Sequence, residues 1–546
     1  MPVVLPFIVG MVVTMAWLPV LVRAAIRWSF VDLPGTRKVH ALPVPRVGGL
    51  AMLTGVFAAA AIAIPVDRKD EWFLGSAALL AVFGALDDRL DLDYRLKLAG
   101  QCLAVAGVLY GGDVLVGTLT MVDRVVLPHW LSLPLTFVFL VGVTNAVNLA
   151  DGLDGLAGGT TFLCLCAIAL LSGLAGTGTT VSIAAAFAGA VLGFLRFNTH
   201  PARVFMGDAG SQVLGLAIGV LSVRATQNPH SQLSTALPVL LLAIPILDTL
   251  SVMVQRIAEG RSPFSADQNH IHHKLLALGF RHHEAVIVIY VAQATLFLLG
   301  YFLRYATDLM VLGCVSVIFL AIILALQFAA NSVWRVRRVS TGRDAARPGR
   351  AALRAARAAW LSRWSNRAIA LALSAYAVSI VLPPQSVAAN LRPLELALFV
   401  VLIGFLLVYR RHPLGWVEKV SIYTTIALCV FLDSSLPQGD RVATDLRWAI
   451  VAVAALATAI RLRLNDDRRF ELTPLDAIVL FMVLVVPNLP EAWDLPTGSA
   501  LAIGKLCVLF YALETLVSRL DRTAAWVRIA TASLLAALYL RPLLPI

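Results

Sequence analysis

Residues 133–159, LPLTFVFLVGVTNAVNLADGLDGLAGG, join a long apolar run to a short polar segment rich in glycine. Four amides and carboxylates recur in it at intervals of three: Asn145, Asn148, Asp151 and Asp154. Steps of three turn a helical side chain only slowly, so the first three should form one drifting polar stripe. We expect Gly152 to end the helix, with Asp154 either on the turn or capping the next helix. Polar side chains at the end of a membrane span, facing a cavity, are candidates for function.

The rest of the chain is also strongly apolar. Of 546 residues, 59% are hydrophobic and only 14% are charged, and the mean hydropathy is +0.83. A helix satisfies its own backbone hydrogen bonds in lipid, so the sequence predicts an all-α polytopic membrane protein. Apolar runs that can each cross a bilayer give about eleven expected spans in residues 1–330, at 3–22, 48–66, 72–87, 98–115, 129–149, 156–173, 180–196, 208–225, 235–256, 284–303 and 308–330.

Two segments depart from this pattern of spans. Residues 113–128 alternate apolar and polar side chains, which predicts a short external β-hairpin. Residues 331–365 are rich in arginine and alanine, and after Pro348 they fit either an amphipathic helix on anionic lipid or a solvated linker. We therefore divide the chain into a core at 1–330, a basic cytoplasmic linker and a C-terminal transmembrane domain at 366–546. About seven further spans are expected in that domain, near 366–383, 392–409, 417–433, 443–460, 474–489, 498–517 and 524–540.

The formal net charge of +12 bears on both partners and orientation. A basic protein can bind nucleic acid, but most of the lysines and arginines here fall in alternate loops between the expected spans. This is the positive-inside pattern, and it places those loops in the cytoplasm. We expect the lipid bilayer, and no nucleic acid, as the partner of these charges.

Four motifs with acidic, amide or histidine side chains lie at the cytoplasmic ends of spans. Besides the opening segment they are LDDRLDLDYRLKLAGQ, RFNTHPARVFMGDAGS and DQNHIHHKLL. Clustered carboxylates at a membrane surface suit Mg²⁺ where phosphates complete its coordination. Lys97, Arg46 and Arg203 can offset phosphate charge, Gly207 precedes a helix whose first N–H groups can bind phosphate, and histidine can transfer a proton near neutral pH. Together these residues favour Mg²⁺-dependent transfer of a phosphorylated group between a nucleotide and a lipid.

These motifs resemble those of the polyprenyl-phosphate N-acetylhexosamine-1-phosphate transferases of glycosyltransferase family 4. The stretches that match, in the family's order and within about residues 1–330, are RKVHALPVPRVGGLAM, GALDDRLDLDYRLKLAGQ, NAVNLADGLDGLAGG, FNTHPARVFMGDAGS and NHIHHKLLALGF. The resemblance implies an enzyme of the bacterial inner (cytoplasmic) membrane, active at the cytoplasmic face. It implies transfer of a sugar-1-phosphate from a UDP-N-acetylhexosamine to undecaprenyl phosphate with release of UMP, at the start of a cell-surface polysaccharide. Mg²⁺ is the implied cofactor, with Mn²⁺ as an alternative, and a homodimer is left open.

The resemblance also assigns roles to individual residues. Asp208 matches the Mg²⁺-binding aspartate, and Asp87 and Asp88 match an acidic pair near the lipid phosphate. Phe205 matches the aromatic residue that stacks on uracil, and Asp154 or Asp151 the acid near the nucleoside. The remaining candidates are catalytic histidines and further substrate-binding residues: His270, His272 and His273, with Arg46, Lys97, Asn145, Asn148, Asn198 and Arg203.

The choice of sugar and the C-terminal domain leave alternatives open. The PVPRVGG and HIHH stretches resemble the branch that uses UDP-GlcNAc, with related N-acetylated deoxysugars as the alternative. Residues 366–546 match nothing in the family core, so a membrane transporter or an assembly module is open for them. Lys505 and Glu514 lie inside one apolar segment there, where they either snorkel toward opposite membrane surfaces or have a function.

Overall fold

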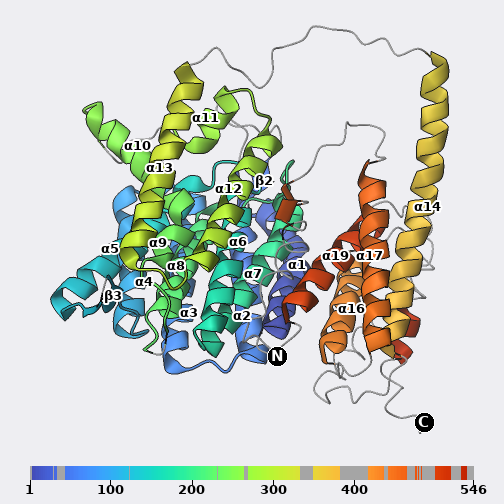
Figure 1. The fold of residues 1–546 in the computed structure, drawn as a ribbon, viewed down its shortest axis with the longest axis horizontal. Helices are drawn as coiled ribbons and strands as arrows, with labels where there is room; N and C mark the ends of the chain where they lie inside the picture. The colour runs from blue at the N-terminus through green and yellow to red at the C-terminus, as the bar shows by residue number, and fades with distance from the viewer. Residues whose placement is uncertain are drawn as a thin grey trace. The chain divides into compact units, whose positions relative to one another are not determined.

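The computed structural model describes the N-terminal two thirds of the chain nearly completely and the remainder in pieces (Figure 1). The described residues are 3–28, 30–32, 43–121, 123–229, 231–262, 269–331, 348–381, 416–435, 441–463, 474–475, 477–478, 481, 499–517 and 531–537. The chain forms two compact units, the first built mainly on Met1–Ser340 and the second on residues beyond Thr341.

The first unit is a bundle of helices. Its helices are α1 (Val4–Arg27), α2 (Gly48–Ala63), α3 (Arg68–Leu90), α4 (Tyr94–Tyr110), α5 (His129–Ala150), α6 (Leu156–Leu174), α7 (Gly178–Asn198), α8 (Gly207–Thr226), α9 (Leu237–Leu241), α10 (Ala243–Ala258), α11 (Ile271–Ala277), α12 (His282–Phe302) and α13 (Asp308–Asn331). Helix α8 is almost wholly buried, because α2, α3, α5 and α6 all pack against it. The start of this central helix is therefore surrounded by the ends of several others.

The predicted fold class is confirmed. Within the described residues, eight helices are long and apolar enough to cross a membrane, seven of them in the first unit. Helices that form one unbroken span follow the predicted bounds closely. Helix α5, for example, is predicted at 129–149 and observed at His129–Ala150. Helix α3 begins at a capping box, in which Asp67 accepts the backbone N–H of Asp70 and Asp70 accepts that of Asp67.

The span predicted at 235–256 is wrong as a single helix, because it is broken at Leu242 into α9 and α10. Pro245 has no backbone N–H, so it cannot bond to the carbonyl of Leu241 four residues earlier, and its ring would clash with that carbonyl. Two other helices satisfy the freed oxygen: Gln293 Nε2 donates to it at 2.9 Å and Cys164 Sγ at 3.3 Å. The proline in an apolar run was the signal that could have predicted the break.

Two small hairpins complete the first unit. The predicted hairpin is present as β3 (Thr118–Thr120) and β4 (Arg124–Val126), which pair antiparallel. A second pair, β1 (Val31–Asp32) with β2 (Val44–Pro45), was not predicted. It sets the position of the residues that lead into α2.

The second unit contains four long described helices: α14 (Pro348–Val381), α16 (Trp416–Ser435), α17 (Arg441–Arg463) and α19 (Ser499–Val517). They pack on one another, with α14 against α17 and α16 against α19 (Figure 1). The basic segment after Pro348 is helical and continues without a break into the span predicted at 366–383. The predicted spans at 392–409, 474–489 and 524–540 lie wholly or largely outside the described residues.

Candidate active site

Residues from separate motifs meet at the first turn of α8. Asp87 and Asp88 come from the last turns of α3, Lys97 from the first turn of α4, Arg46 from the segment after β2, and Asp208 from α8 itself. Each is linked to at least one other by an ion pair or a hydrogen bond. The sequence motifs thus converge in space as predicted, and the roles assigned to their residues stay predictions.

Lys97 lies between two carboxylates. Its Nζ is 2.5 Å from Asp87 Oδ2 and 3.3 Å from Asp208 Oδ2. The Asp87 side chain is only 3% exposed, whereas those of Lys97 and Asp208 are 30% and 28% exposed. The buried carboxylate of Asp87 thus binds the ammonium from the protein interior. The charged groups of Lys97 and Asp208, which are opposite in sign, are both partly exposed to solvent.

Asp88 has a different environment from its neighbour Asp87. Its Oδ1 accepts the backbone N–H of Asp208 at 3.1 Å, and its Oδ2 accepts that of Ala209 at 3.3 Å. The first N–H groups of a helix lack partners within the helix. A carboxylate here accepts their hydrogen bonds, and its negative charge interacts favourably with the positive end of the helix dipole. Gly207 has φ of +72°, and a Cβ there would lie 2.4 Å from Asp88 Oδ2, so this position requires glycine.

Arg46 connects this cluster to the unpredicted hairpin. Its guanidinium pairs with the buried Asp32 of β1 and lies 3.5 Å from Asp88 Oδ1. The segment after β2 is held to the 199–206 loop by backbone bonds, from Phe205 N to Pro45 O and from Gly48 N to Phe205 O. Sequence reasoning missed Asp32, since a lone aspartate before a loop carries no distinguishing pattern.

The polar stripe of α5 faces the central helix. Asn145 exchanges hydrogen bonds with Gln101 of α4, and Gln101 Nε2 also donates to Gln212 of α8 at 3.3 Å. One step further along, Asn148 Oδ1 accepts the hydroxyl of Ser211 at 2.6 Å. Both asparagines therefore bind to other helices and fix α5 against α4 and α8. Gln101 and Gln212 were missed, although buried glutamines in apolar helices are a usable signal.

The turn after α5 carries the two aspartates. Burial, together with the negative charges of Asp88 and Asp154, raises the pKa of the Asp151 carboxyl to about 7. Burial also acts to raise the pKa of Asp154, but hydrogen bonds from His200 and from the Ala202 N–H outweigh it and keep that pKa below its usual value. Asp154 lies on the turn and does not cap α6, whose N-cap is Gly155.

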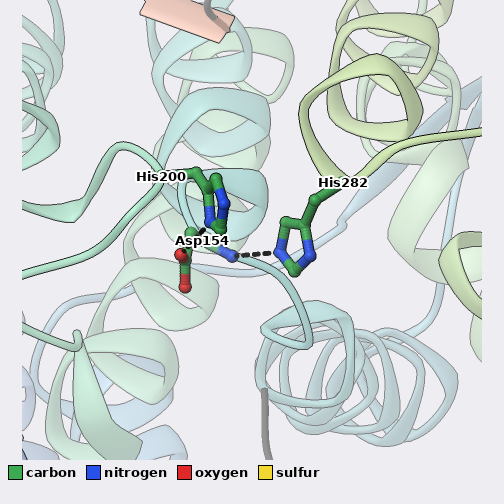
Figure 2. A group of neighbouring side chains, drawn as sticks. All are labelled: Asp154, His200 and His282. Carbon is green, nitrogen blue, oxygen red and sulfur yellow. Dashed lines mark hydrogen bonds and ion pairs between the residues drawn. The ribbon is translucent and has the colours of Figure 1, made fainter. Parts of the chain in front are cut away.

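Two histidines that were not predicted lie beside Asp154, as Figure 2 shows. His200 Nδ1 is 2.7 Å from Asp154 Oδ2, and His282 Nε2 accepts the Asp154 N–H at 3.4 Å. The two imidazoles stack with their ring centroids 4.7 Å apart. Within the described residues, this is the one group of three or more whose possible metal-ligand atoms lie within 4.8 Å of one another. Two imidazoles with one carboxylate suit Zn²⁺ rather than Mg²⁺.

The end of α7 and the loop to α8 hold three more predicted residues. Asn198 is 4% exposed; its Oδ1 accepts the Gly155 N–H and its Nδ2 donates to Val204 O, both at 2.9 Å. It therefore fixes the α5–α6 turn against this loop, which favours a positioning role over substrate contact. Arg203 is exposed and Phe205 is half-buried, so both remain candidates for binding.

The histidine motif lies against the same turn. His270 Nδ1 is 2.9 Å from Asp248 Oδ2 of α10, and both side chains are 7% exposed. A Cβ at residue 152 would lie 2.3 Å from His272 Nε2, so the ring of His272 packs where only glycine leaves room. Burial lowers the pKa of His272 to about 4, helped by its neighbour His273, so His272 is neutral at pH 7. His273 is half-buried beside it.

The acidic cluster fits a hard divalent cation. Asp208 offers a partly exposed carboxylate, and Asp87 places a second carboxylate on the same ammonium of Lys97. Carboxylate oxygens and substrate phosphates are the usual ligands of Mg²⁺. In the described structure the ammonium of Lys97 offsets part of the charge that such an ion would neutralise.

Fold and site together define a polytopic helical membrane protein with a cluster of acidic and basic side chains at the start of its central helix, α8. The sequence model of the family described as glycosyl transferase family 4 matches residues 72–226. The chain is 37% identical over 298 residues to the probable undecaprenyl-phosphate N-acetylglucosaminyl 1-phosphate transferase of Bacillus subtilis, covering 53% of this chain and 81% of that protein. The chain belongs to glycosyl transferase family 4, and it is a membrane phosphotransferase.

Two further relatives agree with this assignment. The chain is 37% identical over 305 residues to the decaprenyl-phosphate N-acetylglucosaminephosphotransferase of Mycolicibacterium smegmatis, covering 50% of this chain and 74% of that protein. It is 28% identical over 324 residues to the undecaprenyl-phosphate alpha-N-acetylglucosaminyl 1-phosphate transferase of Escherichia coli (strain K12), covering 58% and 88%. This chain is longer than the part that these relatives match.

Proposed function

We propose that the protein transfers GlcNAc-1-phosphate from UDP-GlcNAc to undecaprenyl phosphate at the cytoplasmic face of the bacterial inner membrane, releasing UMP. The observation that carries this proposal is the convergence of Asp87, Lys97 and Asp208, from three helices, at the N-terminus of α8. The names of the relatives support a prenyl-phosphate acceptor and an N-acetylglucosamine phosphate group. Such a transfer would start the synthesis of a cell-surface polysaccharide.

The chemistry that we propose is a single displacement. An oxygen of the lipid phosphate attacks the phosphorus that carries the sugar, and a new P–O bond forms. The bond from that phosphorus to the oxygen shared with the α-phosphate breaks, and UMP leaves with that oxygen. A phosphomonoester has a second pKa of about 6, so the acceptor is mostly dianionic at pH 7 and needs positioning more than deprotonation. Mg²⁺, with Mn²⁺ as an alternative, would supply charge neutralisation on the diphosphate, held by Asp208 with Asp87 in reach.

The residues of this chain would then act on charge and position. Lys97 and Arg46 offset the charge of the two phosphate groups, since both present cations on the solvent side of the cluster. Asp88 fixes the first turn of α8 and Asp87 fixes Lys97, and these contacts favour positioning roles over proton acceptance. Asp151 and Asp154, with Phe205 across the loop, are the residues that we assign to the nucleoside.

The decisive experiment is a transfer assay with the purified full-length chain. Radiolabelled UDP-GlcNAc, UDP-GalNAc and a UDP-N-acetylated deoxysugar would each be offered with undecaprenyl phosphate, and lipid-linked product and UMP would be measured. We expect equal amounts of product and UMP, with UDP-GlcNAc preferred. A preference for another donor would reassign the sugar alone, whereas no product from any UDP-sugar would refute the proposed function. A phospho-aspartyl enzyme trapped from donor without acceptor would refute the single displacement.

A further inference from the structure

The second unit buries a cluster of charged residues to which the transfer reaction gives no role. Each of its four long helices contributes one residue: Tyr376 from α14, Asp433 from α16, Arg447 from α17 and Lys505 from α19. All four are at most 9% exposed. The alternative that Lys505 snorkels to the membrane surface is therefore wrong, since its ammonium lies inside the unit.

The other three side chains converge on the carboxylate of Asp433. Asp433 Oδ2 is 2.5 Å from Lys505 Nζ and accepts the hydroxyl of Tyr376 at 3.0 Å. Asp433 Oδ1 is 2.9 Å from Arg447 Nε. Lys505 Nζ also lies 4.6 Å from the ring centroid of Trp448, a cation–π contact.

Among the residues that the structure describes, the charges of this cluster do not balance. Arginine is always protonated in proteins, so with a charged lysine the cluster holds two cations and one anion. Burying a charge is costly unless it is paired, and inside a membrane protein such charges usually mark a functional site. An isolated structural ion pair would need only one of the two cations. One additional monovalent anion would balance the cluster.

The cluster lies near one end of the unit. Asp433 is two residues from the end of α16, and Arg447 and Lys505 are each six residues from the start of their helices. Six residues of helix rise is about 9 Å, so the site lies close to the membrane surface at which α17 and α19 begin. It is the surface opposite to the arginine-rich segment that the positive-inside rule places in the cytoplasm.

We propose that this cluster is a binding site for a monocarboxylate, held by Arg447 and Lys505 on the external side of the second unit. A carboxylate matches the surplus of one positive charge, and its two oxygens match the planar fork of a guanidinium. Within the described residues, Arg447 has a second, longer contact, from Nη2 to Thr444 Oγ1 at 3.4 Å. Asp433 pairs with Nε of Arg447, so a ligand carboxylate would bind the terminal nitrogens Nη1 and Nη2 without displacing Asp433. The proposal does not depend on the transfer reaction of the first unit.

Equilibrium binding to the purified full-length protein in nanodiscs tests this proposal. Radiolabelled acetate and glucuronate would be the probes, with unlabelled inorganic phosphate and chloride as competitors. Arg447→Gln and Lys505→Gln each leave one cation against Asp433, so both should remain folded, as size-exclusion chromatography and thermal unfolding would show. Arg363→Gln is the matched control, because it removes the same charge from an exposed position on α14.

We expect saturable binding of a carboxylate by the wild type and by Arg363→Gln. Each cluster variant should bind it at least about tenfold more weakly, since a hydrogen bond to a charged group is worth roughly that factor. The absence of saturable carboxylate binding, or binding that both cluster variants retain, would refute the proposal. Displacement by chloride or phosphate in preference to unlabelled carboxylate would assign the site to inorganic anions and would also refute it.

Discussion

Replacing Lys97 with methionine should change metal binding and donor binding in opposite directions. The ammonium now lies 2.5 Å from Asp87 Oδ2 and 3.3 Å from Asp208 Oδ2. Without the ammonium, the carboxylates of Asp87 and Asp208 repel each other, so a divalent cation that neutralises both should bind more tightly. The diphosphate of the donor, in contrast, loses one of the cations that offsets its charge.

The magnitude follows from Coulomb's law with a discount for exposure. Unit charges about 4 Å apart interact by roughly 4 kcal/mol at an effective dielectric constant of about 20. Lys97 and Asp208 are close to one third exposed, so solvent and salt should reduce the net effect to about 1–2 kcal/mol, or roughly tenfold in a binding constant.

Two assays on the same preparation separate these effects. Electron paramagnetic resonance of Mn²⁺ would measure the affinity of the enzyme for the ion in the absence of donor, and initial rates would give KM and kcat for UDP-GlcNAc. For Lys97→Met we expect about tenfold tighter Mn²⁺ binding, a higher KM and a lower kcat. Lys69→Met is the control, since Lys69 pairs with Asp113 near the other end of α3 and both are exposed. Unchanged or weaker Mn²⁺ binding by a folded Lys97→Met would show that the ammonium does not compete with the ion.

Three further predictions concern the same reaction. Asp208→Asn should lower kcat at least about a hundredfold, because a neutral amide is a poor ligand for Mg²⁺; a variant with full activity, or a wild type active in excess EDTA, would exclude this role. Asp151, with its pKa raised to about 7, is neutral below that pH and charged above it, so KM for the anionic donor should rise between pH 6 and 8, and Asp151→Asn should flatten that profile; identical profiles would contradict this account. A chain ending near residue 340 should retain transfer when compared with the full chain at equal amounts of folded protein, whereas a folded but inactive truncation would mean that the second unit completes the site.

The sequence predicted the helices well because length and apolar composition determine where a chain can cross a membrane. It also predicted that Asp87, Lys97 and Asp208 would lie together, because the topology brings their span ends to one face. It did not predict the partner of each residue. Asp87 and Asp88 are adjacent in the sequence, yet one binds an ammonium and the other a helix N-terminus. That difference depends on the packing of α3 against α8, which no local pattern encodes.

Long-range partners were the residues most easily missed. His200 reaches Asp154 from the α7–α8 loop and His282 from the first turn of α12, and histidines in polar segments are too common to be selected from a sequence. Asp248 was recoverable in principle, because a carboxylate inside the apolar run of α10 requires a partner, and that partner is His270. Whether the predicted residues contact substrate stays a prediction for the assays above.

The capping of α8 by Asp88 has a consequence for backbone motion. Amide protons in the first turn of a helix normally exchange with solvent deuterium quickly, because they have no partner within the helix. Those of Asp208 and Ala209 instead bind a carboxylate that is only 1% exposed. The first turn of α8 should therefore exchange as slowly as the interior of a helix, and Asp88→Ala should release those two amides selectively. The carboxylate of Asp208 is carried on a backbone that cannot fray, which gives it a fixed position before any substrate arrives.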